Sequence, residues 1–397
     1  MTKKMNVAVI FGGRSGEHEV SLVSADFIIK TLDKKKYNVI RIGITKDGQW
    51  IAGENSLDLL KSGDILKALK ATLTPDTNIK SLVQICNKNY KELRIMSSNT
   101  NSHVNCGLQI TDKIDVVFPV LHGTYGEDGT IQGLFELADL PYVGSGVLGS
   151  AVAMDKITQK NICMAANLPM ADWVWLTKKE WHWLKKNKDV FKKWLNSTEK
   201  KLGFPIFVKP SNLGSSVGIS KVKNRGEFIK AINLAGRFDR RIVVEKGVED
   251  MMEIEIAVLG NGKPEASIPG QIIPSGEFYD YSAKYVDDRS EKIIPAPLPE
   301  KIIRQIQNIA VEAFKLLDCA GMARVDFFVE KKSYKIYLSE INTIPGFTSI
   351  SMYPKLWQAS GVSPQKLLDI LIRLALERHG EKKQLITSIQ MKDEWYK

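Results

Sequence analysis

The sequence predicts an α/β protein of two or three domains, because strands and helices alternate near its start and because the chain is long. Residues 5–11 (MNVAVIF) and 37–44 (YNVIRIGI) are apolar runs typical of buried strands, and residues 21–32 between them have helical spacing. A further apolar run at 113–121 predicts another strand. Such alternation predicts a parallel sheet. At 397 residues, the chain exceeds what one hydrophobic core usually supports.

Changes in composition suggest where the domains begin and end. The N-terminal unit is expected to hold the parallel sheet and a weakly patterned insertion at about 52–110, rich in Asn, Ser and Lys. The stretches GSGVLGS at 144–150 and RIVVEKGVED at 241–250 mark the next two boundaries. The predicted units are therefore 1–144, 145–242 and 243–380, followed by a polar tail at 381–397.

The overall composition is that of an ordinary soluble protein, with 44% apolar and 25% charged residues. We find no apolar run of transmembrane length, and the start MTKKMNVAVIFGG is interpreted as a first strand rather than a signal peptide. The four cysteines have neither paired nor metal-binding spacing, which fits a reducing compartment. We therefore expect a cytoplasmic protein without a membrane partner.

The net charge of +11 raises the question of an anionic partner. Residues 178–201 hold nine lysines against three acidic residues, and this segment alone contributes +6. Its Trp and Leu spacing predicts a solvated amphipathic helix, and contact with an anionic surface stays open as the alternative. We expect no nucleic-acid partner, because the sequence shows no basic groove with interleaved aromatic residues.

A lysine followed by a glycine- and serine-rich loop is the first candidate for chemistry. The apolar run PIFVKP ends at Lys209 and Pro210, and Gly214-Ser215-Ser216-Val217-Gly218 follows. Glycines let backbone N–H groups approach an oxyanion, and a lysine at a strand end can neutralise phosphate charge. The lysine precedes the glycines, so this is not the common phosphate-binding loop. A simple hairpin with a flexible tip remains the alternative.

Two further strands are predicted to present oxygen ligands on one face. The segments 321–330 and 334–343 have strand composition, and the KKS between them is interpreted as a turn. Residues i and i+2 of a strand share a face, so a turn of odd length brings Asp326, Glu340 and Asn342 together with Arg324. Such ligands suit Mg²⁺ bound with substrate phosphates. The alternative is a pair of salt bridges across a solvated hairpin.

A turn that could bind a substrate carboxylate follows these strands. The stretch IPGFTSIS at 344–351 combines a tight Pro-Gly turn with the hydroxyl donors Thr348, Ser349 and Ser351.

Seven stretches in a specific order resemble the D-alanine–D-alanine ligase family of the ATP-grasp superfamily. They are FGGRSGEHEVSL (11–22), VLHGTYGEDGTIQG (120–133), GSGVLGSAVAMDK (144–156), VKPSNLGSSVGISKV (208–222), EFYDYSAKY (277–285), ARVDFF (323–328) and EINTIPGFTSIS (340–351). The resemblance covers roughly residues 5–50 and 113–380. It implies a three-domain ATP-grasp architecture, α+β in its ATP-grasp part, with an N-terminal parallel-sheet domain.

The resemblance implies ATP and Mg²⁺ (or Mn²⁺) as cofactors. By resemblance, Lys156 and Lys209 contact the phosphates, Ser215 and Ser216 lie near the triphosphate, and Lys284 also contributes to nucleotide binding. The hinge residues Glu245, Lys246 and Val248 pair with adenine, and Glu253 reaches the ribose. The metal ligands are Asp326, Glu340 and Asn342. Met252 departs from the family pattern, in which a basic residue often precedes the glutamate.

The resemblance also implies roles toward two D-alanine substrates. Glu17 and His122 bind the first D-alanine, and Arg324 and the Gly346 N–H stabilise the tetrahedral intermediate. Ser351 and Met352 hold the second D-alanine, and Ser215 links Glu17 to Tyr285 in a lid at 277–291. The implied activity is formation of D-alanyl-D-alanine through an acylphosphate for peptidoglycan precursor synthesis, by a homodimer. A D-lactate or D-serine ligase and an inactive nucleotide-binding relative are the alternatives.

Overall fold

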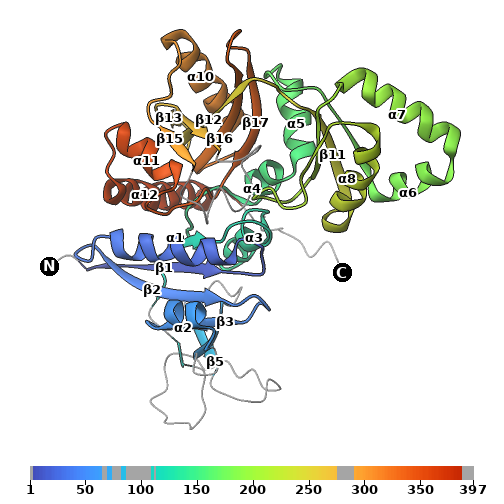
Figure 1. Ribbon diagram of the computed structural model, residues 1–397. Coiled ribbons are helices and arrows are strands. Elements are labelled where there is room, and N and C mark those ends of the chain that lie inside the picture. Colours follow the sequence, from blue (N-terminus) through green and yellow to red (C-terminus); the bar gives the residue numbers. More distant parts are fainter. Residues whose placement is uncertain are drawn as a thin grey trace, which may run out of the picture.

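The computed structural model describes residues 3–64, 69–73, 82–85, 109–110, 113–274 and 290–386 (Figure 1). The predicted lid residues Lys284 and Tyr285 lie outside the described residues, as does the rest of the lid up to residue 289. Across the part of the chain that is described, no helix combines the length and the apolar character needed to cross a bilayer.

The N-terminal sheet confirms the predicted parallel arrangement and extends it. Strand β1 (Met5–Gly12) runs parallel to β2 (Tyr37–Ile44) on one side and to β7 (Val116–Val120) on the other. The predicted insertion continues the same sheet with antiparallel strands in the order β6-β5-β4-β3-β2. The remaining elements are β3 (Trp50–Ala52), β4 (Leu69–Leu73), β5 (Leu82–Ile85), β6 (Gln109–Ile110), α1 (His18–Thr31), α2 (Ser56–Ser62) and α3 (Thr130–Leu137).

A separate four-stranded antiparallel sheet, in the order β10-β9-β11-β8, forms the lobe at the right of Figure 1. Its strands are β8 (Trp173–Thr177), β9 (Ile206–Pro210), β10 (Ser220–Val222) and β11 (Arg241–Lys246). Its helices are α6 (Lys178–Lys186), α7 (Lys188–Leu202) and α8 (Arg225–Phe238). Trp181, Phe228 and Ile232 of the helices pack against Val208 and Val244 of the strands. The helices therefore cover one face of this sheet and leave the other face open to a cleft.

The lysine-rich segment forms two helices rather than the single predicted helix. Thr177 and Glu180 form a capping box at the start of α6. Asn187 ends α6 and begins α7, with φ −114° and ψ 80°, outside the helical region. The break lets both helices press aromatic residues into one core, where the rings of Trp181 and Trp194 lie 6.3 Å apart.

The C-terminal part contains a second antiparallel sheet, whose main path is β15-β14-β12-β16-β17. Its strands are β12 (Met251–Gly260), β13 (Glu265–Ala266), β14 (Gly270–Ile273), β15 (Glu291–Ile293), β16 (Gly321–Glu330) and β17 (Ile336–Asn342). The remaining helices are α4 (Val147–Met154), α5 (Lys156–Ala165), α10 (Glu300–Leu316), α11 (Met352–Ala359) and α12 (Pro364–Lys383). All of β11 belongs to the four-stranded sheet, so the change of sheet comes after Lys246 rather than at the predicted 242/243 boundary.

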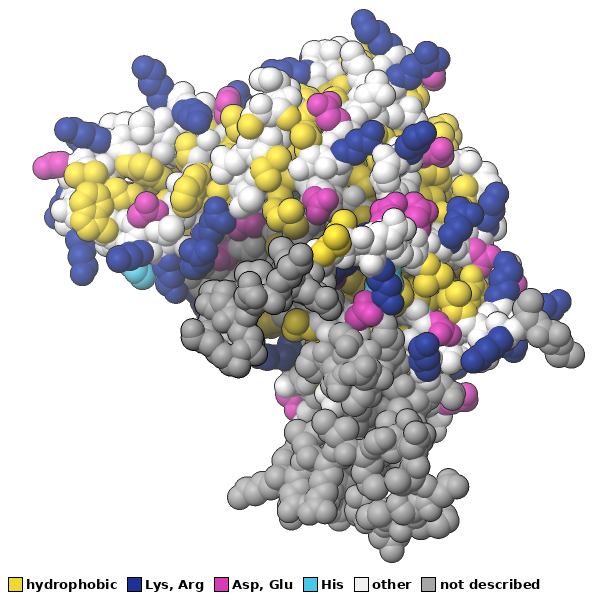
Figure 2. Space-filling view, turned by 180° about the vertical axis from the view of Figure 1, so that it is seen from behind, with side chains coloured by type: hydrophobic (Ala, Val, Ile, Leu, Met, Phe, Trp, Pro, Cys, Tyr) yellow, Lys and Arg dark blue, Asp and Glu magenta, His cyan; other side chains and the backbone are white. Residues whose placement is uncertain are grey.

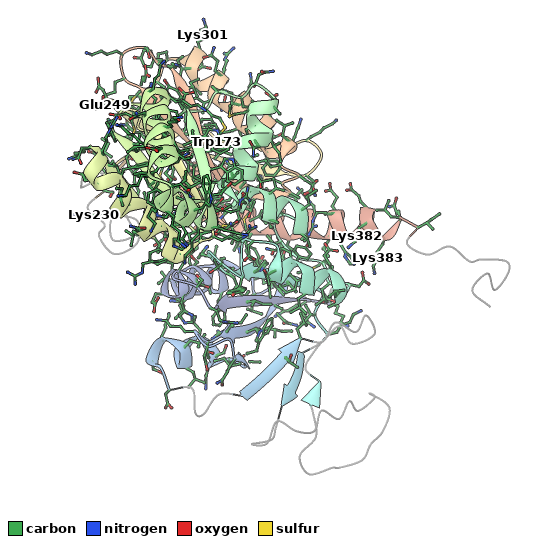
Figure 3. All side chains as sticks on the ribbon, turned by 90° about the vertical axis from the view of Figure 1, so that its right-hand side faces the viewer. Trp173, Lys230, Glu249, Lys301, Lys382 and Lys383 are labelled. Atoms are coloured by element: carbon green, nitrogen blue, oxygen red, sulfur yellow. The ribbon has the colours of Figure 1, made fainter. Side chains whose placement is uncertain are left out.

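Helices α11 and α12 lie between the C-terminal sheet and the N-terminal sheet (Figure 1). One hydrophobic core contains residues of both sheets and of both helices. Helix α12 continues to Lys383, past the predicted boundary at residue 380. Its last turn reaches the end of α3, where Lys382 pairs with Glu136, and the loop that follows, where the Lys383 Nζ lies 3.4 Å from the Asp139 Oδ2. Both lysines are labelled in Figure 3. These ion pairs give the helix end partners that the sequence pattern does not reveal.

Candidate active site

A cleft between the four-stranded sheet and the C-terminal sheet contains the residues predicted to bind the nucleotide. Its cavity volume is about 450 Å³, within the range usual for small-molecule sites. Ten residues predicted as nucleotide or metal ligands line it: Lys156, Lys209, Ser215, Ser216, Glu245, Lys246, Val248, Glu253, Asp326 and Glu340. The fold thus brings together side chains from α5, β9, β11, β12, β16, β17 and the loop 211–219.

Glu245 is the electrostatic centre of the wall formed by the four-stranded sheet. Its carboxylate lies 2.7 Å from the Lys209 Nζ and 3.0 Å from the Lys160 Nζ. Burial opposes ionisation, yet these two ammonium groups outweigh it and lower the pKa of Glu245 to about 2. Burial alone would lower the pKa of Lys209, but Glu245 raises it above its ordinary value. Glu245 therefore keeps Lys209 charged and directs it along the cleft.

Lys160 is a site residue that the sequence analysis missed. Its side chain is only 2% exposed, and burial lowers its pKa despite the ion pair with Glu245. A signal was present, because Lys156 and Lys160 are four residues apart on α5 and share one face of the helix. Lys156 donates to the Leu213 backbone oxygen at 2.8 Å and lies 3.4 Å from the Glu340 carboxylate.

The hairpin of β16 and β17 presents the predicted oxygen ligands on one face. Asp326 stands opposite Glu340, and Arg324 opposite Asn342. This register depends on an irregularity between Asp326 and Phe327, because Phe327 pairs with Leu338 and one extra residue on β17 precedes Glu340. The connection between the strands is 331–335, two residues longer than the predicted KKS turn. Val329 pairs with Ile336, which leaves an even number of residues between them, so it is the bulge that places Asp326 opposite Glu340.

Arg324 and the residues around it form a charged group at the inner end of the cleft. The Arg324 guanidinium donates two hydrogen bonds of 2.7 Å to Asp326 and lies 3.3 Å from the Glu255 carboxylate. The Asn342 amide oxygen accepts a 3.1 Å hydrogen bond from the Ile344 N–H. Among the described residues, no group of three His, Cys, Asp or Glu side chains has the geometry of a metal site. Two carboxylates and an amide on one face are nevertheless the hard oxygen donors that Mg²⁺ prefers.

The glycine- and serine-rich loop connects β9 to β10, so the predicted hairpin is present and its tip folds over the cleft. Ser215 and Ser216 both have left-handed backbones, with φ of 50° and 60°. At Gly214 a Cβ would lie 2.5 Å from the Glu17 carboxylate oxygen, so any larger residue would displace that carboxylate. The buried Ser215 Oγ has no hydrogen-bond partner among the described residues, which leaves it available for the predicted link to Tyr285.

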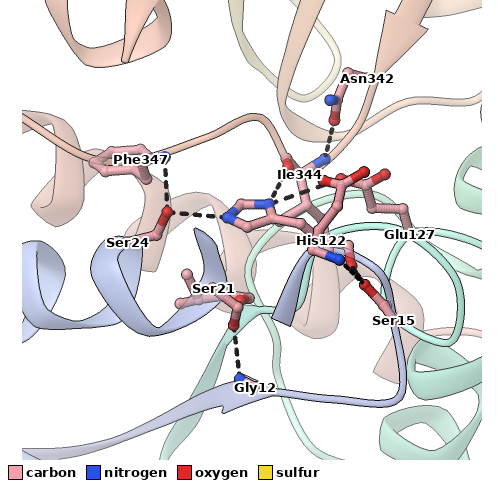
Figure 4. Close-up of polar contacts among 12 residues, drawn as sticks. Gly12, Ser15, Ser21, Ser24, His122, Glu127, Asn342, Ile344 and Phe347 are labelled. Atoms are coloured by element: carbon pink, nitrogen blue, oxygen red, sulfur yellow. Dashed lines mark hydrogen bonds and ion pairs between the residues drawn. The ribbon is translucent and has the colours of Figure 1, made fainter. Parts of the chain in front are cut away.

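His122 lies at the edge of the N-terminal sheet (Figure 4), and the Ser15 hydroxyl links it to Glu17, because it donates to the His122 backbone oxygen at 2.6 Å and accepts from the Glu17 N–H at 2.9 Å. His122 Nδ1 donates to the Ile344 backbone oxygen at 2.9 Å, and its Nε2 lies 3.0 Å from the Ser24 Oγ. Glu127, which the sequence analysis did not single out, lies 3.8 Å from His122 Nδ1. Burial raises the pKa of Glu127 to about 7. A small cavity of about 30 Å³ is lined by Glu17, Ser215, Arg324 and Asn342.

Four other residues that the sequence analysis named have surroundings that the structure describes. Gly346 is buried in the loop that packs on Ser24, next to Phe347, whose N–H donates to the Ser24 Oγ at 3.3 Å. The Ser351 hydroxyl lies 2.7 Å from the Thr348 hydroxyl. Met352 packs its side chain into the core between the sheets, so only its backbone could face a substrate. Met252 points into the core of the C-terminal sheet, on the opposite face from Glu253.

Two antiparallel sheets that enclose a lysine-lined cleft define an ATP-grasp protein, which confirms the fold class predicted from the sequence. Residues 6–145 match the protein family described as the D-ala D-ala ligase N-terminus. Residues 162–373 match the family described as the D-ala D-ala ligase C-terminus. The chain therefore belongs to the D-alanine–D-alanine ligase family.

Relatives over nearly the whole chain support this membership. The D-alanine–D-alanine ligase of Acetivibrio thermocellus is 49% identical over 96% of this chain and 98% of its own, and that of Natranaerobius thermophilus is 48% identical over 96% and 97%. The D-alanine-D-alanine ligase structure from Coxiella burnetii has a TM-score of 0.78 and 38% identity, covering 96% of this chain and 97% of its own. The VanG D-Ala:D-Ser ligase from Enterococcus faecalis has a TM-score of 0.77 and 35% identity, covering 94% and 100%.

Proposed function

We propose that this protein joins two D-alanine molecules to D-alanyl-D-alanine in an ATP-dependent reaction that serves peptidoglycan precursor synthesis. One observation carries the proposal: a single cleft combines lysines for phosphates, opposed carboxylates for a metal, and Glu17 and Arg324 at its inner end. The γ-phosphoryl group of ATP moves to the carboxylate of the first D-alanine and gives D-alanyl phosphate, with ADP as the leaving group. The amine of the second D-alanine, after losing a proton, then attacks the acyl carbon, and phosphate leaves.

The nucleotide is proposed to lie along the 450 Å³ cavity. Adenine contacts the hinge at Glu245, Lys246 and Val248, and the ribose contacts Glu253. Lys156 and Lys209 meet the phosphates, because phosphoryl transfer depends on positioning and on neutralising negative charge. Ser215 and Ser216 cover the triphosphate from the loop above, and Lys284 of the lid adds a further cation.

Asp326, Glu340 and Asn342 are proposed to hold Mg²⁺ (or Mn²⁺). Their oxygens fit a hard divalent cation, and Asp326 and Glu340 both line the cavity proposed for the nucleotide. When bound, the metal would neutralise phosphate charge during transfer. The Arg324 guanidinium, which is hydrogen-bonded to Asp326, holds that carboxylate in one orientation.

The first D-alanine is proposed to bind where Glu17 and Arg324 line the small inner cavity. Glu17 accepts the substrate ammonium, and His122 supports this end of the site. Arg324 and the Gly346 N–H stabilise the tetrahedral oxyanion, which requires fixed donors. Ser351 and the Met352 backbone position the second D-alanine. Tyr285 closes the lid through the Ser215 hydroxyl, which excludes water from the acylphosphate.

Three properties of the protein in the cell complete the proposal. We propose that it works in the cytoplasm, on small-molecule substrates, and as a homodimer. Light scattering of the eluted protein during gel filtration measures the assembly mass directly. A dimer mass supports the proposal, and a monomer mass at micromolar protein contradicts it.

The variant Lys209→Ala tests the proposed function. We expect kcat for phosphate release, with ATP and D-alanine, to fall at least about 100-fold, because a cation at the phosphates is lost. The fold should persist, since Glu245 keeps one buried partner, Lys160. Lys230→Ala is the matched control, an exposed lysine on α8 of the same lobe, labelled in Figure 3. Near-native phosphate release by a folded Lys209→Ala variant would refute the proposal.

A further inference from the structure

The positive charge of this protein is concentrated in one lobe. From the first residue of β8 to the last residue of β11, residues 173–246, there are 18 Lys and Arg against 6 Asp and Glu, a net charge of +12. The rest of the chain holds 38 basic and 39 acidic residues and is nearly neutral. The cleft accounts for only a few of these cations, namely Lys209, Lys221 and Lys246. Most of the excess charge therefore needs another explanation.

The outer surface of α6 and α7 carries much of this charge, and we call it the lysine-rich face. All nine of its lysines are exposed: Lys178, Lys179, Lys185, Lys186, Lys188, Lys192, Lys193, Lys200 and Lys201. None of the nine forms an ion pair with any residue that the structure describes. Two nearby carboxylates are already engaged, because Glu180 caps α6 and Glu199 accepts from Arg225 at 2.6 Å. The charge of the face is thus largely uncompensated.

Apolar side chains stand exposed among these lysines. Trp183 of α6 is 53% exposed and Val190 of α7 is 41% exposed, whereas Trp181 is buried in the lobe's own core. Figure 2 shows this lobe at its left, with Lys and Arg side chains around its edge and hydrophobic side chains between them. A large indole left in water beside ammonium groups matches the chemistry of a membrane interface, where the ring enters the headgroup region and the lysines remain outside.

We propose that the lysine-rich face binds the surface of an anionic lipid bilayer. Lysines near such a surface each add to the attraction, and an inserted Trp adds apolar burial. The lysine-rich face contains no arginine, the residue best suited to bidentate recognition of nucleic acids. The cleft lies on the other side of the same sheet, where Phe207 and Lys209 point. A bound enzyme would therefore keep its nucleotide cleft accessible. The proposal differs from the expectation, based on composition, that the protein has no membrane partner.

Sedimentation with vesicles tests the proposal on the full-length protein. We expect binding to vesicles of phosphatidylglycerol and phosphatidylcholine, little binding to phosphatidylcholine alone, and release by about 0.5 M NaCl because salt screens the attraction. The fourfold variant K186Q/K188Q/K192Q/K193Q should lose at least about 100-fold in vesicle affinity. The matched control K34Q/K35Q/K301Q/K332Q removes the same charge from exposed positions elsewhere and should lose less than about tenfold.

Two further measurements keep the outcome unambiguous. Both fourfold variants should retain phosphate release, which shows that they are folded. Trp183→Ser should weaken vesicle binding by about tenfold even though no charge changes. Equal losses in the two fourfold variants, equal binding to neutral vesicles, or tighter binding to a DNA duplex than to the anionic vesicles would each overturn the proposal.

Discussion

Replacing Glu245 by glutamine removes the only carboxylate that the structure places within ion-pair distance of both Lys160 and Lys209 among the described residues. The pKa of Glu245 is about 2 against an ordinary value of 4.5. That difference corresponds to about 3 kcal/mol of folding free energy at neutral pH. Leaving buried ammonium groups without a counter-ion has a typical cost of about 3–5 kcal/mol. We therefore expect Glu245→Gln to lower the free energy of unfolding by about 3 kcal/mol or more.

Urea unfolding followed by tryptophan fluorescence measures this effect in the right place, because five of the eight tryptophans lie between residues 173 and 194. Glu199→Gln is the control in the same lobe. It breaks a largely exposed ion pair with Arg225 and should cost no more than about 1 kcal/mol. Adding Lys160→Met to Glu245→Gln should recover at least about 1 kcal/mol, because one stranded ammonium group is removed.

The pH dependence supplies an independent check of sign. A carboxylate whose pKa is lowered on folding stabilises the protein above its unfolded pKa, and that stabilisation is lost as the pH falls through the folded value. The stability difference between the wild type and Glu245→Gln should therefore be full above about pH 4.5 and shrink toward about pH 2. A cost no larger than that of Glu199→Gln, or a difference that stays constant across this range, would refute the electrostatic account.

Two further predictions concern the ligand sites. Asp326→Asn and Glu340→Gln should each raise the Mg²⁺ concentration needed for half-maximal phosphate release and lower kcat at least about tenfold. The control Lys332→Ala, in the exposed connection of the same hairpin, should change neither quantity. Equal effects at all three positions would indicate that these carboxylates form structural salt bridges instead of binding a metal. Gly214→Ala should raise KM for D-alanine at least about tenfold with little change in KM for ATP, because the new Cβ would lie 2.5 Å from the Glu17 carboxylate oxygen. Gly262→Ala, with open space around it, is the control. An unchanged KM for D-alanine in Gly214→Ala would show that the loop does not position Glu17.

The fold could be predicted largely because its signals are local. Apolar runs and strand–helix alternation at 5–44 suffice for a parallel sheet, and the parallel pairing of β1 with β2 confirms it. The break of the lysine-rich helix at Asn187 could not be predicted. It depends on the core that α6 and α7 share with Phe228, a residue more than 30 positions further along the chain.

Site residues could be predicted where polar side chains alternate along one strand. They could not be predicted where their positions depend on tertiary packing. Asp326 and Glu340 face each other because of a β-bulge, and no residue pattern in the sequence predicts that bulge. The only sequence signal for Lys160 was its helical spacing from Lys156. Its role depends on a buried ion pair with Glu245, which only the tertiary structure reveals. The sequence analysis assigned Met352, which follows the turn at 344–351, to the second D-alanine by resemblance. Its side chain, however, packs in the core against Gly270.

The identity of the second substrate is the most direct test of the proposed reaction. The stretch Ala283-Lys284-Tyr285 is present in the sequence, within the segment proposed to form the lid. The purified enzyme should be incubated with ATP, D-alanine and an excess of D-lactate near neutral pH, and its products identified by mass spectrometry. We predict D-alanyl-D-alanine with little or no D-alanyl-D-lactate. Substantial ester would contradict the D-alanine–D-alanine assignment, even if phosphate release showed the ATP-grasp chemistry to be intact.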